Sequence, residues 1–445
     1  MRILHWSGPL TMALLIAAPN LLLADGESAP SQESPAAAPI PSASQLREWA
    51  AELGSASFRQ RQRAYRQLQQ ADRLALPALC EAAHNEDMET RWRALSLLVE
   101  LCISRQAGQP QAVERSLAEL AADPRPAVAF AAKAALRQCR AAKTAIATEQ
   151  IERFGGSVSL DEADEASTDA DSTPTLRVQI GATWREGDDR LALLADLGNV
   201  VALDLERAPI SDAALRHIVP LRELQILDLS YTGVTSQGLS LLKGLPNLRH
   251  LTLQHVKLGP GGLAVVAGFS QLTSLDLEGS DITDRELAHL RKLPLLQDLS
   301  LAKTGIADAG LADLKDCTTL NSLRLMGTKV SGAGLRELTG LSRLSHLSLK
   351  SCQLQPDALA AIATLEHLDF LGLENTNITD EQLAELANLK QLRVLWLHHT
   401  QLTNASVEHL KKIKSLEELY LSGTRITTSG KKALETALPN CRIGI

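Results

Sequence analysis

Aromatic residues are scarce in this 445-residue chain. Phe, Trp and Tyr make up 3% of it, although 45% of its residues are hydrophobic. The core must therefore be filled mainly by Leu and Ala. Uniform layers of small aliphatic side chains are typical of solenoids, in which each repeat packs on its neighbours. The composition indicates a repeat protein.

An excess of positive charge is also missing. The formal net charge is −7, and six acidic residues with no basic residue lie between positions 155 and 175. Binding to a phosphate backbone requires a basic surface. We therefore expect no nucleic acid among the partners of this protein.

The chain lacks the short motifs of catalytic, cofactor and metal sites. It contains no GxSxG, HExxH, P-loop or dinucleotide-binding sequence. None of its six cysteines stands in a CxxC or other metal-type spacing. We expect a protein that is not an enzyme and that uses no cofactor and no metal.

The N-terminal residues 1–24 have the pattern of an export signal. Arg2 supplies a positive charge, Pro9 to Leu23 is apolar, and Ala24 is a small residue suited to cleavage. An uncleaved membrane anchor is the alternative, but the stretch is short for a span and Pro19 interrupts it. We predict export to the periplasm, cell surface or medium, with no integral membrane segment after cleavage.

Export permits disulfides, but the sequence names no pair; Cys80 with Cys102 is one option.

Residues 25–42 are rich in Ala, Pro and Ser and predict a disordered tether.

Residues 43–154 predict paired helices, because the segment 61–68 (RQRAYRQL) recurs as 91–98 (RWRALSLL) and again at 129–136. This segment resembles the HEAT-repeat family, in an Arg-rich form of exported bacterial proteins. Residues 155–175 predict an acidic flexible linker.

One helical face of the HEAT-like domain carries Arg59, Arg63 and Arg66. A solvated face is the simpler interpretation of these arginines, and a docking patch for an acid-rich partner is the alternative.

From Leu203 onward the chain repeats every 24 residues. Leu occupies positions one and three in ten copies, from Leu203 and Leu205 to Leu419 and Leu421. Alternation with period two predicts a short strand with one buried face. Position six is Thr or Ser in seven copies, and position nine is Ser or Thr in seven. Position nine suits a helix N-cap, and the Asp or Pro of position ten suits the first helical turn.

This "LxLxxTxITDxGLxxLxxLxxL" pattern resembles the leucine-rich-repeat family. It is similar to the subtype of planctomycete-type exported bacterial proteins and to the cysteine-containing repeats of F-box adaptors. The resemblance implies an α/β solenoid, a horseshoe with a parallel sheet on its concave face, preceded by the small α-helical HEAT-like domain. We expect an N-terminal cap at 176–202 and the repeat domain at 203–445, with ten repeats and a final strand.

The concave face of this horseshoe is the expected binding surface. Its exposed side chains come from positions 24, 2, 4 and 5, and they are acidic towards the N-terminus and aromatic or cationic towards the C-terminus. The candidate partner-binding residues are Asp204, Asp228, Asp276, Glu278, Arg324, Met326, Lys350, Phe370, Trp396, His398 and Tyr420. Trp, Tyr and Arg dominate interface energetics. Alternatively, Phe370, Val394, Trp396 and Tyr420 merely cover each other.

Two acids of this surface have the spacing of a catalytic pair. Asp204 and Asp228 on adjacent strands would lie about 5 Å apart, as in a retaining glycosidase. Any two repeats produce that spacing, so it does not indicate catalysis. We predict a non-enzymatic protein-binding scaffold of the cell envelope or secreted fraction. A binder of glycans or envelope polymers is the alternative, and an F-box-like adaptor in ubiquitin-dependent degradation is a weaker one.

Overall fold

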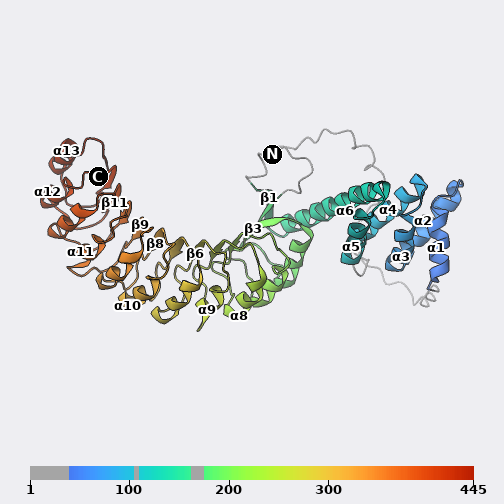
Figure 1. Cartoon of the computed structure of the whole chain (residues 1–445), viewed down its shortest axis with the longest axis horizontal. Coiled ribbons are helices and arrows are strands. Elements are labelled where there is room, and N and C mark those ends of the chain that lie inside the picture. The colour runs from blue at the N-terminus through green and yellow to red at the C-terminus, as the bar shows by residue number, and fades with distance from the viewer. Residues whose placement is uncertain (1–39, 105–109, 162–174, 445) are drawn as a thin grey trace, which may run out of the picture.

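A computed structural model describes residues 40–104, 110–161 and 175–444. The expected signal peptide, nearly all of the tether and most of the acidic linker lie outside these residues. The described part consists of a helical domain followed by a long curved solenoid (Figure 1). None of its helices has the length and apolar character needed to cross a membrane.

The helical domain is a stack of antiparallel helices around one aliphatic core. The recurring segments at 61–68, 91–98 and 129–136 lie in its second, fourth and sixth α-helices, and their Ala64, Ala94 and Ala132 are fully buried. Its helices are α1 (Ala43–Glu52), α2 (Phe58–Ala71), η1 (Asp72–Ala75), α3 (Leu76–Ala82), α4 (Met88–Ile103), α5 (Pro110–Ala121) and α6 (Pro126–Arg153). The assignment of this domain to the HEAT family stays a prediction.

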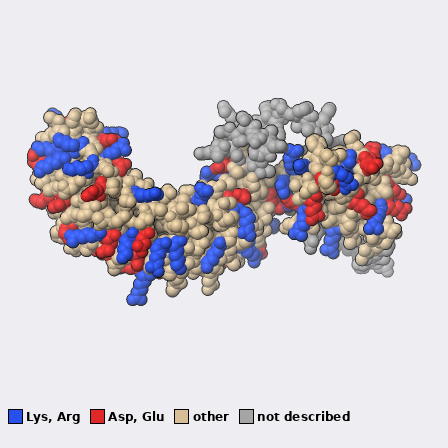
Figure 2. Space-filling model, in the orientation of Figure 1, with Lys and Arg blue, Asp and Glu red and all other residues tan. Residues whose placement is uncertain are grey.

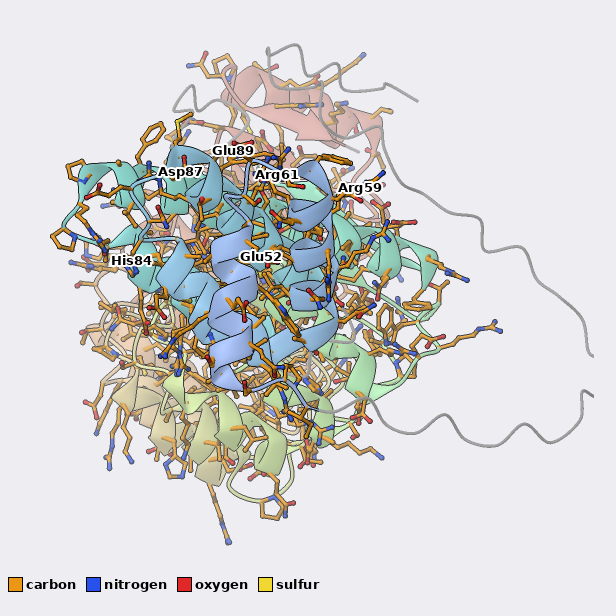
Figure 3. The ribbon with its side chains drawn as sticks, turned by 90° about the vertical axis from the view of Figure 1, so that its right-hand side faces the viewer. Glu52, Arg59, Arg61, His84, Asp87 and Glu89 are labelled. Carbon is orange, nitrogen blue, oxygen red and sulfur yellow. A yellow bond between two sulfur atoms is a disulfide. The ribbon has the colours of Figure 1, made fainter. Side chains whose placement is uncertain are left out.

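The arginines of α2 are exposed, as the sequence predicts. Arg59, Arg63 and Arg66 lie opposite the buried Ala64 and Leu68. Figure 3 shows Arg59 and Arg61 on α2, close to the start of α4 with Asp87 and Glu89.

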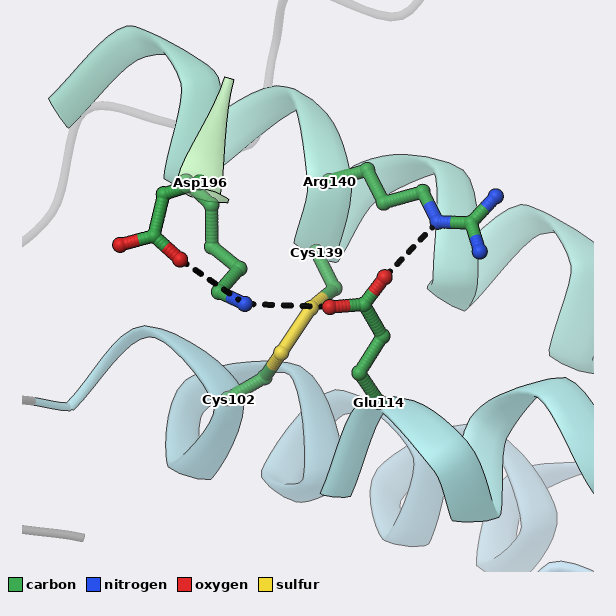
Figure 4. Close-up of a disulfide and its surroundings, with 6 residues drawn as sticks. Cys102, Glu114, Cys139, Arg140 and Asp196 are labelled. Atoms are coloured by element: carbon green, nitrogen blue, oxygen red, sulfur yellow. Dashed lines mark hydrogen bonds and ion pairs between the residues drawn. A yellow bond between two sulfur atoms is a disulfide. The ribbon is translucent and has the colours of Figure 1, made fainter. Parts of the chain in front are cut away.

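A disulfide joins Cys102 of α4 to Cys139 of α6 (Figure 4). The option of a Cys80–Cys102 bridge is therefore wrong. Cys80 is a half-buried free thiol on α3, whereas α4 and α6 pack directly on each other. The pairing follows from the packing of α6, which local sequence spacing does not reveal.

Helix α6 belongs to both cores. Its first half buries Val128, Ala132 and Cys139 in the helical domain, and its last turns bury Ala147 and Ile151 in the core of the solenoid. The two parts therefore share one continuous helix instead of a flexible joint.

Polar contacts reinforce the junction between the two parts. The side chain of Lys143 is only 10% exposed and forms ion pairs with Glu114 of α5 (3.0 Å) and Asp196 of the solenoid (3.1 Å) (Figure 4). Burial lowers the pKa of Lys143, but the hydrogen bonds and charges of Glu114 and Asp196 outweigh it and raise that pKa. Thr144 on the same helix donates a hydrogen bond to the carbonyl oxygens of Asp196 and Leu197.

The solenoid is built on one 13-stranded sheet whose strands follow in sequence order. All neighbouring strands from β2 onward are parallel, and those from β3 onward are in register, so Leu347, Leu371 and Leu395 stand side by side. This is a leucine-rich-repeat solenoid of the α/β class. Its strands are β1 (Gly156–Leu160), β2 (Leu176–Ile180), β3 (Val200–Asp204), β4 (Ile226–Asp228), β5 (His250–Thr252), β6 (Ser274–Asp276), β7 (Asp298–Ser300), β8 (Ser322–Arg324), β9 (His346–Ser348), β10 (Phe370–Gly372), β11 (Val394–Trp396), β12 (Glu418–Tyr420) and β13 (Arg442–Gly444).

The sequence predicts a flexible linker over 155–175, but the first part of this range forms the N-terminal edge of the sheet. Residues 156–160 form β1, which pairs antiparallel with β2 and closes that edge. The alternation of Val158 and Leu160 with serines is a strand pattern that the neighbouring acids obscured. A register shift at Leu176/Arg177 brings Val178 opposite Leu203, which absorbs the one-residue offset of this cap from the 24-residue period. Trp184 is fully buried here and contacts Phe154 edge-on.

Short helices and turns form the outer face, and the strands line the hollow (Figure 1). The outer elements are η2 (Asp188–Asp196), η3 (Asp212–His217), α8 (Ser236–Leu239), η4 (Ser240–Gly244), α9 (Gly262–Val266), η5 (Asp284–Lys292), α10 (Asp308–Leu311), η6 (Ala312–Leu314), η7 (Ala333–Gly340), α11 (Ala358–Ile362), η8 (Glu381–Asn388), η9 (Asn404–Ser406), α12 (Val407–Leu410) and α13 (Thr428–Ala437). The leucines of strands and helices together form one continuous core along the solenoid.

The hydroxyls of position six satisfy buried backbone carbonyls. Thr304, Thr328 and Thr376 are buried, and each donates to the carbonyl oxygen three residues earlier. Cys352 takes the same place and donates to the carbonyl of Leu325 in the preceding repeat. These bonds leave no orphaned hydroxyl in the core.

The Asp residues of position ten do more than suit the helix start. Each accepts hydrogen bonds from position nine of the next repeat, so they link neighbouring repeats. The linked pairs are Asp188–Ser211, Asp212–Thr235, Asp284–Ala307, Asp308–Ser331 and Asp380–Thr403. Asp308 accepts from Ser331 and from the backbone amides of Gly332 and Gly334. Burial raises its pKa, but these hydrogen bonds outweigh burial and leave the pKa below 3.8.

We predict that Asp308→Asn destabilises the protein by about 2 kcal/mol at pH 7, the usual contribution of hydrogen bonds to a charged group. The carboxyl pKa of Asp308 is lower in the folded than in the unfolded protein, so this group adds to the free energy of unfolding above the unfolded pKa near 3.8. That contribution is lost as the pH falls through the folded pKa. The difference between D308N and wild type in urea unfolding should therefore shrink from pH 7 to pH 3. The exposed Asp316→Asn is the control and should change little; a pH-independent cost for D308N would contradict this account.

We predict that Lys143→Met loosens the junction between the two parts. The change keeps the aliphatic stem but leaves Asp196 without its ion-pair partner, at a cost of about 1–3 kcal/mol. Amide hydrogen exchange in residues 188–197 should accelerate. Lys133→Met, on an exposed position of the same helix, is the matched control and should stay within about 0.5 kcal/mol of wild type. Equal amide exchange rates in residues 188–197 of the two variants would contradict the proposed role of Lys143 in holding the two parts together.

Candidate functional site

The hollow of the solenoid presents the side chains of positions 24, 2, 4 and 5, as the repeat pattern predicts. In the view of Figure 2, many Lys and Arg side chains project from the outer face instead. The predicted binding residues are all at least partly accessible. Arg324, Lys350 and Trp396 are exposed, and the remaining eight are half-buried: Asp204, Asp228, Asp276, Glu278, Met326, Phe370, His398 and Tyr420.

The C-terminal half of the hollow holds a continuous aromatic patch, composed of His346, Phe370, Trp396, His398 and Tyr420. The ring centroids of Phe370 and Trp396 are 4.9 Å apart and those of Trp396 and Tyr420 are 6.0 Å apart, both edge-to-face. His346 stacks on Phe370, and His398 lies 5.4 Å from Tyr420. The in-register strands β9 to β12 bring these rings together.

Trp396 remains 37% exposed within the patch. Edge-to-face contacts hold its indole without covering it, and Tyr420 is fixed by a hydrogen bond from its hydroxyl to Glu418. A large ring that neighbouring side chains orient but leave open to solvent is a suitable anchor for a partner.

The N-terminal half carries an acidic strip, composed of Asp204, Glu206, Asp228, Asp276 and Glu278. Asp204 and Asp228 stand opposite each other on β3 and β4, whereas Asp276 and Glu278 are separated from them by β5. Burial, together with the nearby charges of Asp204 and Glu206, raises the pKa of Asp228, although hydrogen bonds from Ser230 oppose the shift. Glu278 is neutralised by an ion pair with Lys303 at 2.8 Å.

The acidic strip is bordered by a stack that the sequence reasoning missed. The guanidinium of Arg207 lies 4.6 Å above the Tyr231 ring, and Tyr231 stacks on His255 with 4.6 Å between centroids. All three occupy position five, where every repeat has positive φ, between 53° and 77°. Because β3, β4 and β5 are parallel and in register, residues at this position of successive repeats are lateral neighbours. Large planar groups at position five of three successive repeats were the available signal.

Glu374 is a second residue that sequence reasoning did not single out. It occupies position four after β10, and only 6% of it is exposed. Its Oε2 atom has no hydrogen-bond partner among the described residues. The signal in the sequence was a glycine at position two of the same strand, Gly372, which leaves room for the carboxylate.

Other parts of the described structure offer little for catalysis. A cavity of about 160 Å³ lies among the turns that precede β9 and β10, away from the concave sheet. Among the described residues, no group of three His, Cys, Asp or Glu side chains is placed to hold a metal ion. Burial raises the pKa of the Cys317 thiol to about 11, which leaves it protonated and unreactive at neutral pH.

The comparisons with known proteins found solved structures that are similar to part of this chain. No protein-family description and no curated protein matches the sequence. An internalin structure from Listeria monocytogenes matches 57% of this chain and 76% of its own chain, with 24% identity and a TM-score of 0.44. A leucine-rich-repeat protein from Leptospira interrogans matches 57% of this chain and 80% of its own, with 19% identity and a TM-score of 0.35. A structure of the mouse RP105/MD-1 complex matches 58% of this chain and 51% of its own chain, with 19% identity and a TM-score of 0.38.

We predict that Trp396→Ala costs only about 1 kcal/mol of folding stability, because it loses edge contacts at a partly exposed position. Leu395→Ala, at the adjacent fully buried position, should cost about 2–5 kcal/mol. Urea unfolding of the two variants measures the difference. If W396A costs as much as L395A, the aromatic patch serves internal packing, as the alternative interpretation holds.

Proposed function

We propose that this protein is a non-enzymatic, exported scaffold that binds a protein partner on the concave face of its repeat domain. The observation that carries the proposal is the aromatic patch, in which five neighbouring rings line the hollow and Trp396 stays exposed. Soluble proteins seldom leave connected aromatic groups open to water without a binding role.

The proposed contact surface combines two chemically distinct regions. The aromatic patch, with Arg324, Met326 and Lys350 beside it, supplies the anchor for the partner. The acidic strip supplies electrostatic complementarity, which steers association and fixes the orientation of a partner with a basic segment. On the sequence patterns we also assign the repeats to the 24-residue subtype of exported bacterial proteins and the helical domain to the HEAT-like class.

The export of this protein is supported by two independent features. The first 24 residues have the pattern of a signal peptide, and Cys102 and Cys139 form a disulfide. Disulfides persist mainly in oxidising compartments. A mature N-terminus at Asp25 in the exported protein would match the proposed cleavage after Ala24.

Site-specific photo-crosslinking tests the binding surface. A photo-reactive phenylalanine at position 396 should form adducts with one specific protein in the native cell envelope. The same group at Arg291, on the outer helix η5, is the matched control and should not. Purified partner should then bind W396A at least tenfold more weakly than wild type, with R291A unaffected.

Two outcomes would contradict this proposal. Adducts with a glycan or envelope polymer in place of a protein would favour the polymer-binding alternative, since exposed aromatic rings also contact sugars. Equal crosslinking from positions 396 and 291 would remove the concave face as the binding surface.

A further inference from the structure

Glu374 on the concave face is only 6% exposed, and one oxygen of its carboxylate has no hydrogen-bond partner among the described residues. Its Oε2 atom is inaccessible and accepts no hydrogen bond, and no ion pair joins Glu374 to any described residue. Removing an ionised carboxylate from water without a compensating donor costs several kcal/mol. The arrangement is therefore suited to a cationic group that the described part of the chain does not provide.

Gly372 creates the space in which this carboxylate lies. It occupies position two of β10, between Ser348 and Trp396 on the neighbouring strands. A Cβ atom at this glycine would lie 2.7 Å from Oε2 of Glu374 and 3.4 Å from Cε1 of Phe370. The carboxylate thus fills the place of the missing side chain. Glycine inside a strand often marks a point where another group approaches closely.

Aromatic rings surround the same point. Phe370 precedes Gly372 on β10, Trp396 stands beside it on β11, and the two rings are in edge-to-face contact. The faces of aromatic rings attract ammonium and guanidinium groups, most strongly where water is excluded. A carboxylate at the base and rings at the sides are the two features that recognise an organic cation.

We propose that the Gly372 site, composed of Ser348, Phe370, Gly372, Glu374 and Trp396, receives a Lys or Arg side chain of the protein partner. Glu374 pairs with the ammonium or guanidinium, and the rings of Phe370 and Trp396 cover its aliphatic stem. This inference rests on the proposed concave-face binding and names the chemistry of its central contact.

Lys350 is the cationic residue of this chain that stands next to Glu374 at the same repeat position. It holds position four of the preceding repeat, but its side chain is exposed and forms no ion pair with Glu374. If Lys350 competes for the carboxylate, its removal helps an external cation. We therefore expect Lys350→Met to bind cations at least as tightly as wild type; weaker binding would overturn the proposal.

Titration with small cations tests the site directly on the full chain. The probes are n-butylammonium and methylguanidinium, with n-pentanol as the uncharged control, and the signal is the indole N–H resonance of Trp396, assigned with W396F. We expect saturable shifts with millimolar dissociation constants for the cations and none for n-pentanol. Glu374→Gln should weaken cation binding at least tenfold. Glu337→Gln, the same change at an exposed position of the outer helix η7, should leave it unchanged.

The folding stability of E374Q separates a binding role from a structural one. Neutralising an unpaired buried charge should leave the protein as stable as wild type or more stable, whereas loss of a hidden structural partner would destabilise it. Marked destabilisation of E374Q, or cation binding that E374Q retains, would overturn the inference. If position 396 crosslinks to a protein but the cations do not saturate, the scaffold function stands and the Gly372 site is wrong.

Discussion

Every repeat of this protein depends on its neighbours to bury its leucines. A 24-residue unit of one short strand and one short helix has no closed core of its own. The leucines at positions one and three are therefore covered only when neighbouring repeats stack, as the strands β2 to β13 do. The hydrogen bonds from position nine to the Asp residues of position ten fasten the outer edge of the same stack. The antiparallel β1 and the last turns of α6 close its N-terminal end.

The same register decides the chemistry of the hollow. Residues at one repeat position become lateral neighbours. Asp204 therefore stands beside Asp228 and adds to the burial that raises the pKa of Asp228, and aromatic rings contact one another between β9 and β12. Glu374 is the exception, since its neighbours at position four, Lys350 and His398, leave one carboxylate oxygen without a donor. We expect a specific contact at the repeat position where the regular pattern of neighbouring side chains is broken.

The 24-residue period was sufficient to predict the strands, the buried leucines and the accessible residues of the concave face. Features that depend on contacts outside the period were not predictable. The bridge between Cys102 and Cys139 depends on how α4 and α6 pack, and β1 was hidden beside an acidic segment. The stack of Arg207, Tyr231 and His255 depends on the positive φ of position five, and the burial of Glu374 depends on the shape of its surroundings.

Helix α6 has a mechanical consequence. Because one 28-residue helix is embedded in both cores, the arginine face of α2 and the aromatic patch of the solenoid are held at a fixed separation and angle. A partner with two matching surfaces would engage the second at no additional cost in chain entropy, provided that its own spacing agrees. Such a partner would be selected by the distance between its two surfaces as well as by their chemistry.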